Sequence, residues 1–458
     1  MQTIVPQVIG MALFFMLSKL LPKETFGLMG WFTAISYLIT VVSSLGLEQI
    51  VFRRLAAGGG KSDWAATAFW RHNLLVSLLL LLLLGGAAVF FPSPKTNLLP
   101  WFFAAQVMLS LATPFRLLLN ARLRYAGYAF ATITANVLKL IAVWIVYELG
   151  MLTLFTTALI FIGGNALEYL LARIAARQWV VKSFRRKAYP LLVRETLPQY
   201  LAVLFDVCLA RLDWILLGLM ATTTSVAEYS FAYKAYEVEK LPTAMITTLL
   251  LPIVSKWSAG NTREVSYEAR QAGFRPLLYL IPAVVGGGAL LAVLLWKPVV
   301  GGLLNSEFGE SSFLPLAVLN LSLVFQFATN LLWVQAFSAR RYRMVSRITG
   351  GTALVNLVLN LVLIPKLGAT GAAISLLGSS VFQLIGYGSG LSKGGFSLPV
   401  KPMIFVFGWS AVLLMVLLLP GLALPWKIAL ILLYPLGLFA SGTVTPKRLT
   451  DLLRFRQA

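Results

Sequence analysis

The feature that most constrains this chain is the recurrence of apolar stretches long enough to cross a membrane. Stretches of about 18 or more mainly apolar residues follow one another along almost the whole sequence. An α-helix needs roughly 20 such residues to span the hydrocarbon core of a bilayer. A transmembrane β-barrel would instead show strands in which apolar and polar residues alternate. We therefore expect an all-α polytopic membrane protein with about fourteen transmembrane helices.

The predicted spans are separated by short polar or basic segments and leave no loop long enough for a soluble domain. They cover 3–21, 29–50, 69–91, 98–120, 129–147, 151–172, 197–219, 229–254, 276–296, 313–337, 348–364, 370–390, 403–420 and 424–441. Only 12% of the residues are charged, against roughly 25% in soluble proteins. The first 21 residues lack a basic start and a small-residue cleavage site, so we expect a retained helix rather than a signal peptide.

The net charge of +22 invites a comparison with nucleic-acid-binding proteins, but its distribution indicates membrane topology. Most lysines and arginines outside the spans fall in the segments of one side, above all in 173–194. The segments of the opposite side carry Lys23, Lys95, Lys297, Lys366 and Lys427. The positive-inside rule then predicts that both termini are cytoplasmic and that no nucleic acid is bound. One cysteine (Cys208) and one histidine (His72) argue against an intramolecular disulfide, a thiolate metal cluster and histidine catalysis.

A hairpin at 206–240 places charged residues where lipid-facing helices cannot carry them. Its first helix contains Asp206, Arg211 and Asp213, and its second contains Lys234, Glu237, Glu239 and Lys240. An ionised side chain at the bilayer centre costs roughly 2.5–3.5 kcal/mol on insertion scales. These side chains must therefore face the interior of a helix bundle or a water-filled cavity.

Three stretches carry a resemblance to a known family. They are LSKLLPKETFGLMG (17–30), RLDWILLGLMATTTSVAEYSFAYK (211–234) and NLVLNLVLIPKLGATGAAISLL (356–377). In this order they resemble the polysaccharide-exporter, O-antigen-type flippase branch of the multidrug/oligosaccharidyl-lipid/polysaccharide (MOP) superfamily. Pro22 stands where that family more often has glycine. The resemblance implies a multi-pass transporter in a bacterial or archaeal cytoplasmic (inner) membrane.

A repeat between 17–57 and 205–263 predicts two parallel six-helix lobes. Parallel repeats are related by a pseudo-two-fold axis along the membrane normal. The predicted parts are an N-lobe, a cytoplasmic basic linker, a C-lobe, and two final helices with a basic tail. They cover 1–175, 176–196, 197–392 and 393–458.

Five cations within the spans are candidates for binding a phosphate-bearing substrate. They are Lys19, Arg116, Lys139, Arg211 and Lys234. Lysine and arginine bind phosphate through charge-assisted hydrogen bonds, whereas a hydrophobic cationic drug would be repelled by them. Alternatives stay open for some of these residues. Lys19 and Arg116 could extend toward the membrane surface. Lys234, Glu237 and Lys240 follow one another at i, i+3 spacing, so the carboxylate of Glu237 could neutralise the lysines on either side of it.

Acidic and amide residues within the spans raise the question of ion coupling. In the peptidoglycan-precursor branch of the superfamily, an Asp of the seventh helix and Asn or Asp residues of the eleventh form a cation site. Asp206 or Asp213 with Asn356 and Asn360 resembles that arrangement, and Na+ or H+ would be the coupled ion. Asn360 stands where an acid is expected, and interhelical hydrogen bonding is the alternative for both asparagines. The two aspartates could instead pair with neighbouring helices, and Glu48 and Glu168 could pair with nearby arginines.

Together these observations favour a flippase that moves a polyprenyl-diphosphate-linked glycan by alternating access for O-antigen, capsule or exopolysaccharide assembly. Its expected partners are that glycan, membrane lipids and the polysaccharide polymerase machinery, and no cofactor is expected. A cation-coupled multidrug exporter is the nearest alternative, and a membrane glycan polymerase or ligase is the second. Neither a catalytic constellation nor a phosphate-binding glycine loop is evident, so we do not expect an enzyme.

Overall fold

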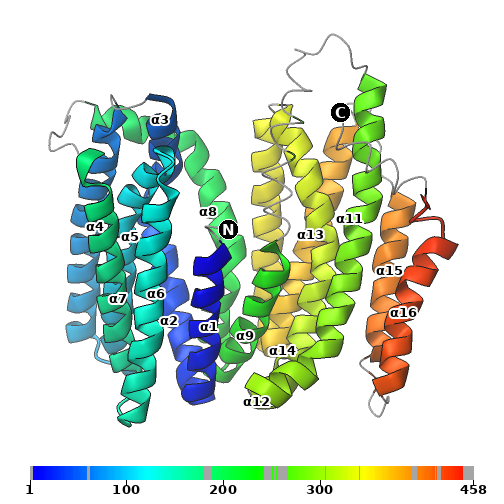
Figure 1. Ribbon diagram of the computed structural model, residues 1–458, viewed down its shortest axis with the longest axis horizontal. Helices are drawn as coiled ribbons and strands as arrows, with labels where there is room; N and C mark the ends of the chain where they lie inside the picture. The colour runs from blue at the N-terminus through cyan, green and yellow to red at the C-terminus, as the bar shows by residue number, and fades with distance from the viewer. Residues whose placement is uncertain are drawn as a thin grey trace. The chain divides into compact units, whose positions relative to one another are not determined.

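The computed structural model describes residues 4–58, 62–179, 188–241, 250, 254, 267–304, 306–339, 341–392, 400–417, 419 and 424–446. All regular structure in these ranges is helical (Figure 1). The elements are α1 (Ile4–Leu20), α2 (Lys23–Ser43), α3 (Leu47–Gly58), α4 (Trp64–Phe90), α5 (Pro94–Ala121), α6 (Tyr125–Glu148), α7 (Leu154–Ala175), η2 (Arg177–Trp179), α8 (Tyr189–Met220), α9 (Thr223–Glu239), α11 (Tyr267–Trp296), η3 (Lys297–Leu304), α12 (Ser306–Ser311), α13 (Phe313–Ser338), α14 (Tyr342–Ser392), α15 (Val400–Leu417) and α16 (Leu424–Ala440).

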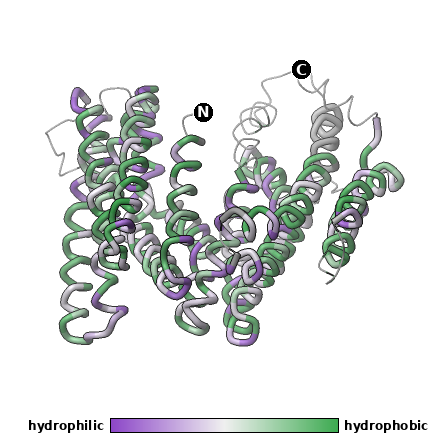
Figure 2. The backbone as a smooth tube through the Cα atoms, turned by 60° about the horizontal axis from the view of Figure 1, so that its bottom comes forward, coloured by the Kyte–Doolittle hydropathy of each residue, from purple (hydrophilic) through white to green (hydrophobic). Residues whose placement is uncertain are grey.

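The helices confirm the expected all-α, multi-pass character. In the described part of the chain, eight are long and apolar enough to cross a membrane, and three shorter apolar helices accompany them. Hydrophobic residues run along most of their length, as Figure 2 shows. The chain divides into two compact units, Met1–Leu219 and Met220–Ala458. By this division α8 belongs to the first unit. The sequence predicts instead that 197–219 is the first helix of the second lobe. The two lobes remain a prediction.

In the first unit, α2 ends earlier than the predicted span 29–50. The hydroxyls of Ser43 and Ser44 donate to the carbonyls of Thr40 and Val41 and compete with the helical backbone pattern. The chain then turns through Leu45 (φ 51°) and Gly46 (φ 71°) before α3 begins. The sequence therefore forms two helices where hydropathy alone predicts one long span.

Among the helices whose starts the structure describes, α5, α7 and α9 begin with a polar side chain that caps their own first turn. Ser93 at the start of α5 and Thr153 at the start of α7 each form a reciprocal capping box with a threonine three residues later. In the second unit, the hydroxyl of Thr222 accepts a hydrogen bond from the backbone N–H of Ser225 at the start of α9. Such caps satisfy N–H groups that a helix cannot pair internally.

In the second unit, α14 contains both predicted spans 348–364 and 370–390, folded against each other as an antiparallel hairpin. The chain reverses at Gly368, whose φ of 52° is non-helical. Pairs on the two arms approach closely, and they are Gly351 with Phe382, Gly386 with Ile348, and Gly390 with Met344. Small residues allow helix backbones to pack closely, as is common in membrane proteins.

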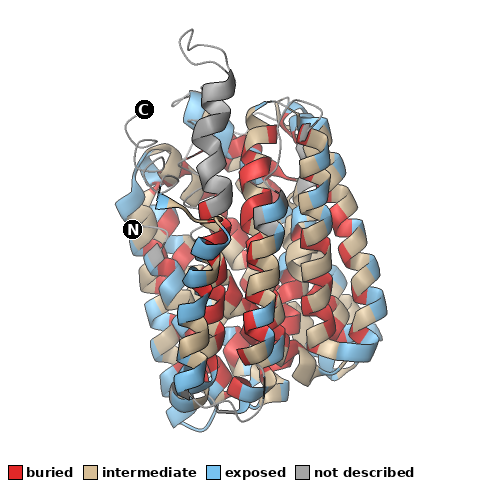
Figure 3. Cartoon of the chain, turned by 90° about the vertical axis from the view of Figure 1, so that its right-hand side faces the viewer, coloured by how far each residue is buried: buried red, intermediate tan, exposed pale blue. Residues whose placement is uncertain are grey.

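Burial follows the same pattern along the helices. Buried residues concentrate along the sides where helices face each other, while exposed residues lie at helix ends and on outward faces (Figure 3). In the first unit, a core packs Phe115 and Leu118 of α5 against Phe69 of α4 and Ala172 of α7. This packing fixes the positions of the polar side chains that α5, α6 and α7 direct toward one another.

Candidate functional site

A buried ion pair joins α5 and α7 in the first unit. The Nη1 group of Arg116 lies 3.1 Å from Oε1 of Glu168, whose side chain is only 2% exposed. Thr132 of α6 donates to the same carboxylate oxygen at 3.1 Å, and Arg116 donates through Nη2 to the hydroxyl of Thr113 at 2.9 Å. Three helices therefore contribute to the environment of one carboxylate.

Lys139 of α6 lies in the same bundle and is only 8% exposed. Its ammonium donates to Oδ1 of Asn165 at 2.9 Å, and Nδ2 of Asn165 in turn donates to the carbonyl of Ala105 at 2.8 Å. The aliphatic part of the lysine packs against Gly164, where a Cβ atom would overlap it. The ammonium is thus held in position by a neutral amide.

Arg116, Lys139 and Glu168 form a polar group that we call the α5–α7 cluster. The charges of Glu168 and Arg116 both act on Lys139. In the described part of the chain, no carboxylate lies within ion-pair distance of Lys139. The cluster holds two cations and one carboxylate, and a second acid, Glu48 of α3, also acts electrostatically on Arg116, so Lys139 is the member of the cluster that is best placed to attract an anion.

Arg211 of α8 lies elsewhere in the first unit, on an aromatic surface. Its guanidinium carbon is 4.9 Å from the ring centroid of Trp214 and 5.7 Å from that of Tyr37 in α2. Aromatic faces hold a guanidinium by cation–π attraction while its edge remains able to donate hydrogen bonds. On the same helix, Asp213 is buried, whereas Asp206 is exposed.

Lys19 and Lys234 are not part of the α5–α7 cluster. Lys19 is exposed in the last turn of α1, and no carboxylate of the described residues lies within ion-pair distance of it. Lys234 belongs to α9 in the second unit and lies 2.7 Å from Glu237, the i, i+3 pairing that its spacing favours. The structure therefore brings two of the five predicted cations together, Arg116 and Lys139.

Asn356 and Asn360 are buried within the α14 hairpin. Nδ2 of Asn360 donates to Oδ1 of Asn356 at 2.9 Å, and Nδ2 of Asn356 lies 3.3 Å from the hydroxyl of Ser379 on the other arm. The asparagines belong to the second unit, and Asp206 and Asp213 belong to the first, so a shared cation site stays a prediction. Among the described residues, no three His, Cys, Asp or Glu side chains are grouped as a metal site requires.

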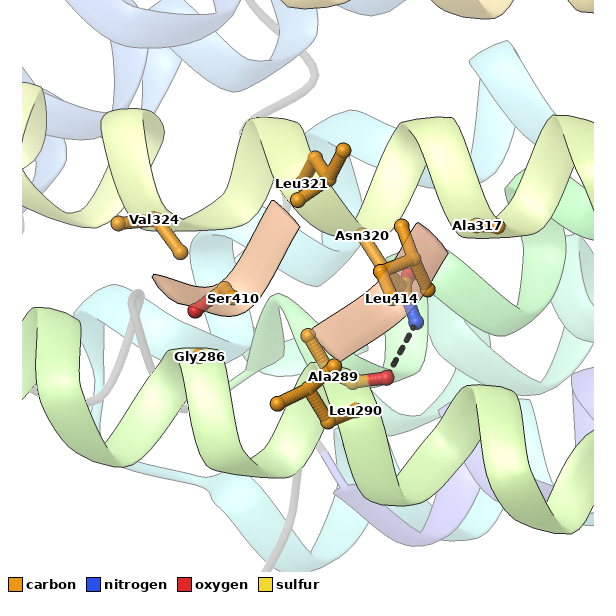
Figure 4. Close-up of a pocket in the computed structure, with 9 residues that line it drawn as sticks. All are labelled: Gly286, Ala289, Leu290, Ala317, Asn320, Leu321, Val324, Ser410 and Leu414. Atoms are coloured by element: carbon orange, nitrogen blue, oxygen red, sulfur yellow. Dashed lines mark hydrogen bonds between the residues drawn. The ribbon is translucent and has the colours of Figure 1, made fainter. Parts of the chain in front are cut away.

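Two polar residues that sequence reasoning did not single out hold key positions. Asn165 lies three residues before Glu168 and therefore on the same side of α7. This spacing to an acid within a predicted span was the available sign that Asn165 also faces the bundle. Asn320 of α13 donates to the carbonyl of Ala289 and to Glu239, both at 3.3 Å. Asn320 and Ser410 are polar members of the lining of a small pocket shown in Figure 4.

Comparison with protein families identifies one match over more than half of the chain. The family described as "Polysaccharide biosynthesis protein" matches residues 1–258. A curated relative from Haloferax volcanii, described as a probable low-salt glycan biosynthesis flippase, Agl15, is 24% identical over 165 residues. That alignment covers 36% of this chain and 34% of the relative, so the chain matches about a third of the relative's length.

Solved structures share the fold of this chain at low sequence identity. The lipid II flippase MurJ in an inward closed conformation has a TM-score of 0.73 and 16% identity, with 96% of this chain and 97% of MurJ covered. An inward-facing multidrug resistance MATE family transporter of the MOP superfamily has a TM-score of 0.62 and 15% identity. That comparison covers 91% of this chain and 96% of the transporter. These named relatives are flippases and transporters, not enzymes.

Proposed function

Because the chain belongs to the polysaccharide biosynthesis protein family within the MOP flippase superfamily, we propose that it translocates a polyprenyl-diphosphate-linked oligosaccharide across the membrane. The relatives support this proposal at the level of glycan flippases, since Agl15 is described as a glycan biosynthesis flippase. We further propose O-antigen, capsule or exopolysaccharide assembly as the pathway and the polysaccharide polymerase machinery as the downstream partner. The proposed location is the inner membrane with both termini in the cytoplasm.

The observation that carries the proposal is the environment of Lys139. A buried ammonium is normally compensated by a carboxylate because an uncompensated charge at membrane depth is costly. Lys139 instead donates to an amide. Glu168 acts on Lys139 without direct contact, and a diphosphate headgroup that reached the α5–α7 cluster would bring negative charge into contact with the ammonium through charge-assisted hydrogen bonds.

Arg116 and Arg211 extend this argument by their hydrogen-bonding capacity. A guanidinium has five N–H donors, and two groups of Arg116 donate to Glu168 and Thr113. The planar guanidinium of Arg211 lies against the rings of Trp214 and Tyr37 and donates through Nη1 to the carbonyl of Ala210 at 3.3 Å. Arg116 can therefore donate to phosphate oxygens while it keeps the contacts that position it.

The proposed mechanism is alternating access, in which the cations face the cytoplasm and then the outside while the polyprenyl chain remains in lipid. An inside-negative potential favours outward movement of an anion by about 2.3 kcal/mol per charge per 100 mV. The membrane potential alone can drive this movement, so translocation does not require ion coupling. We propose separately that Na+ or H+ is coupled through Asp206, Asp213, Asn356 and Asn360.

The test is export of surface glycan by cells that carry the double variant Lys139→Met/Arg211→Met. The replacements keep unbranched apolar side chains but remove both charges. We expect at least about a tenfold loss of surface glycan, the equivalent of one charge-assisted hydrogen bond of about 1.5 kcal/mol. Lys366→Met, at an exposed position in α14, is the matched control and should export normally. Normal export by the double variant at an equal membrane level would overturn the proposal.

A further inference from the structure

A pocket in the second unit lies where α11 meets η3 and where α15 approaches α16. Its volume is about 70 Å3, and it is partly open to the exterior. Its walls are mostly apolar, and two lysines complete them. The lining residues are Val293, Leu294, Lys297, Pro298, Phe313, Leu417 and Lys427. We call this the Lys297–Lys427 pocket.

The two lysines give the pocket an excess of positive charge. Lys297 lies 2.8 Å from Glu310 and 4.8 Å from the ring centroid of Phe313. The Glu310 side chain is 75% exposed, so solvent screens this pair and an incoming anion can replace it at low cost. Lys427 has no carboxylate within ion-pair distance among the residues that the structure describes.

The position of these lysines is unusual for the chain. The segments that the positive-inside rule assigns to the outer side contain five lysines and no arginine, and two of these five line this one pocket. Cations are sparse at this end of the helices, so their convergence on an apolar pocket indicates an anionic ligand.

The surface next to the pocket indicates that this ligand also has an apolar part. Ile428, the residue after Lys427, begins a row at i, i+4 spacing with Leu432 and Leu436, and all three are exposed on one side of α16. Trp426, beside Lys427, is 67% exposed, and tryptophan is enriched at the level of lipid headgroups. An amphiphile could therefore place its charge at the lysines and its chains along α16.

We propose that the Lys297–Lys427 pocket binds the headgroup of an anionic phospholipid, with the phosphate between the two ammonium groups. The acyl chains lie along the exposed apolar side of α16. The site belongs to the outer leaflet under the predicted topology. It is separate from the α5–α7 cluster, and its occupancy does not depend on the translocated substrate proposed above.

The experiment measures lipids retained by the purified full chain in detergent, using native mass spectrometry with added phosphatidylglycerol or phosphatidylcholine. We expect retention of phosphatidylglycerol to fall at least about fivefold in Lys297→Gln/Lys427→Gln, since two charge-assisted contacts are lost. Retention of phosphatidylcholine should change little. Lys297→Arg/Lys427→Arg keeps both charges and should retain phosphatidylglycerol, and Lys366→Gln is the control for loss of an exposed lysine.

Two outcomes would overturn the inference. One is equal retention of phosphatidylglycerol by the wild-type chain and the Gln double variant, with both showing the same thermal unfolding temperature. The other is full displacement of phosphatidylglycerol by glycerol phosphate at equal concentration, because a site for free phosphate would need no acyl chains. If Lys297→Gln/Lys427→Gln unfolds, Lys297→Arg/Lys427→Arg becomes the deciding variant. Both of its charges are kept, so loss of phosphatidylglycerol from it would contradict a site that binds through charge.

Discussion

The ammonium of Lys139 lies 2.9 Å from the side-chain oxygen of Asn165, a neutral amide on the neighbouring helix α7. This contact positions the charge without cancelling it. A lysine that served only to stabilise the bundle would be better compensated by a carboxylate, so stability and transport should respond differently to its removal.

We therefore expect Lys139→Met to separate the two properties. Lys139→Met removes the cost of burying the ammonium but leaves Oδ1 of Asn165 without its donor, so these two effects oppose each other and the thermal unfolding temperature in detergent should change little. Export of surface glycan should fall. Lys139→Ala is the comparison variant and should unfold at a lower temperature, because it leaves a cavity beside Gly164. A large loss of stability in Lys139→Met with normal export would contradict this assignment.

Glu168→Gln should destabilise the first unit. The substitution leaves Arg116 without its carboxylate partner at 3.1 Å in a largely buried position. Removing one partner of a buried pair costs about 3–5 kcal/mol, and less here because the arginine side chain is 21% exposed. Thermal unfolding of Glu168→Gln, Arg116→Gln and the double variant measures the coupling. Additive effects in this cycle would show that the two residues do not interact.

Gly218→Ala should destabilise the contact between α8 and α2. A Cβ atom at Gly218 would overlap the indole of Trp31, whose Nε1 donates to the carbonyl of Ile215 at 3.1 Å. Overpacking of this kind costs about 1–3 kcal/mol, measured as a lower unfolding temperature. Gly85→Ala in α4 meets no atom within 4 Å and should be neutral or slightly stabilising. Adding Trp31→Leu to Gly218→Ala should recover part of the loss.

Glu195 gives the chain a pH-dependent contribution to stability. The hydrogen bond from Arg54, aided by the charges of Arg54 and Arg53, lowers the pKa of the Glu195 carboxyl in the folded chain. A lowered folded pKa stabilises the fold above the unfolded value of about 4.3, and this contribution is lost as the pH falls through the folded pKa. The side chain is 40% exposed, so solvent screening limits the effect to below about 1 kcal/mol.

The measurement is the unfolding temperature of Glu195→Gln relative to the wild-type chain. The difference should be present at pH 7 and disappear toward pH 3. Glu148→Gln, at an exposed acid near the end of α6, is the control and should show no such trend. A difference that persisted unchanged at acid pH would contradict the ion pair with Arg54.

Hydropathy was sufficient to predict the class of fold because a spanning helix is specified by its own sequence. The all-α, multi-pass prediction is confirmed, and the hairpin of α14 lies where 348–364 and 370–390 were predicted. The end of α2 was not predicted, because serine hydroxyls and two left-handed residues decide it locally. Residues 180–187 of the predicted basic linker and most of 241–254 in the predicted eighth span lie outside the described residues.

The candidate site was predicted less completely, since it depends on which helices pack together. The expectation that Glu168 pairs with a nearby arginine agrees with its contact to Arg116. The partner of Lys139 could not be deduced, because the periodicity of α6 shows which side of the helix is polar but not which helix faces it. Asn165 was missed for the same reason. Whether these cations bind substrate stays a prediction.

The capped starts of α5, α7 and α9 have a consequence for biogenesis. Each cap joins residues only three positions apart, so it can form as soon as that turn has been synthesised and has left the ribosome. Each of these helices can thus enter the bilayer with part of its first turn already satisfied, before any partner helix has been synthesised. The order of synthesis then need not match the order of packing, and the buried charges of α5, α6 and α7 can be matched after all three helices are in the membrane.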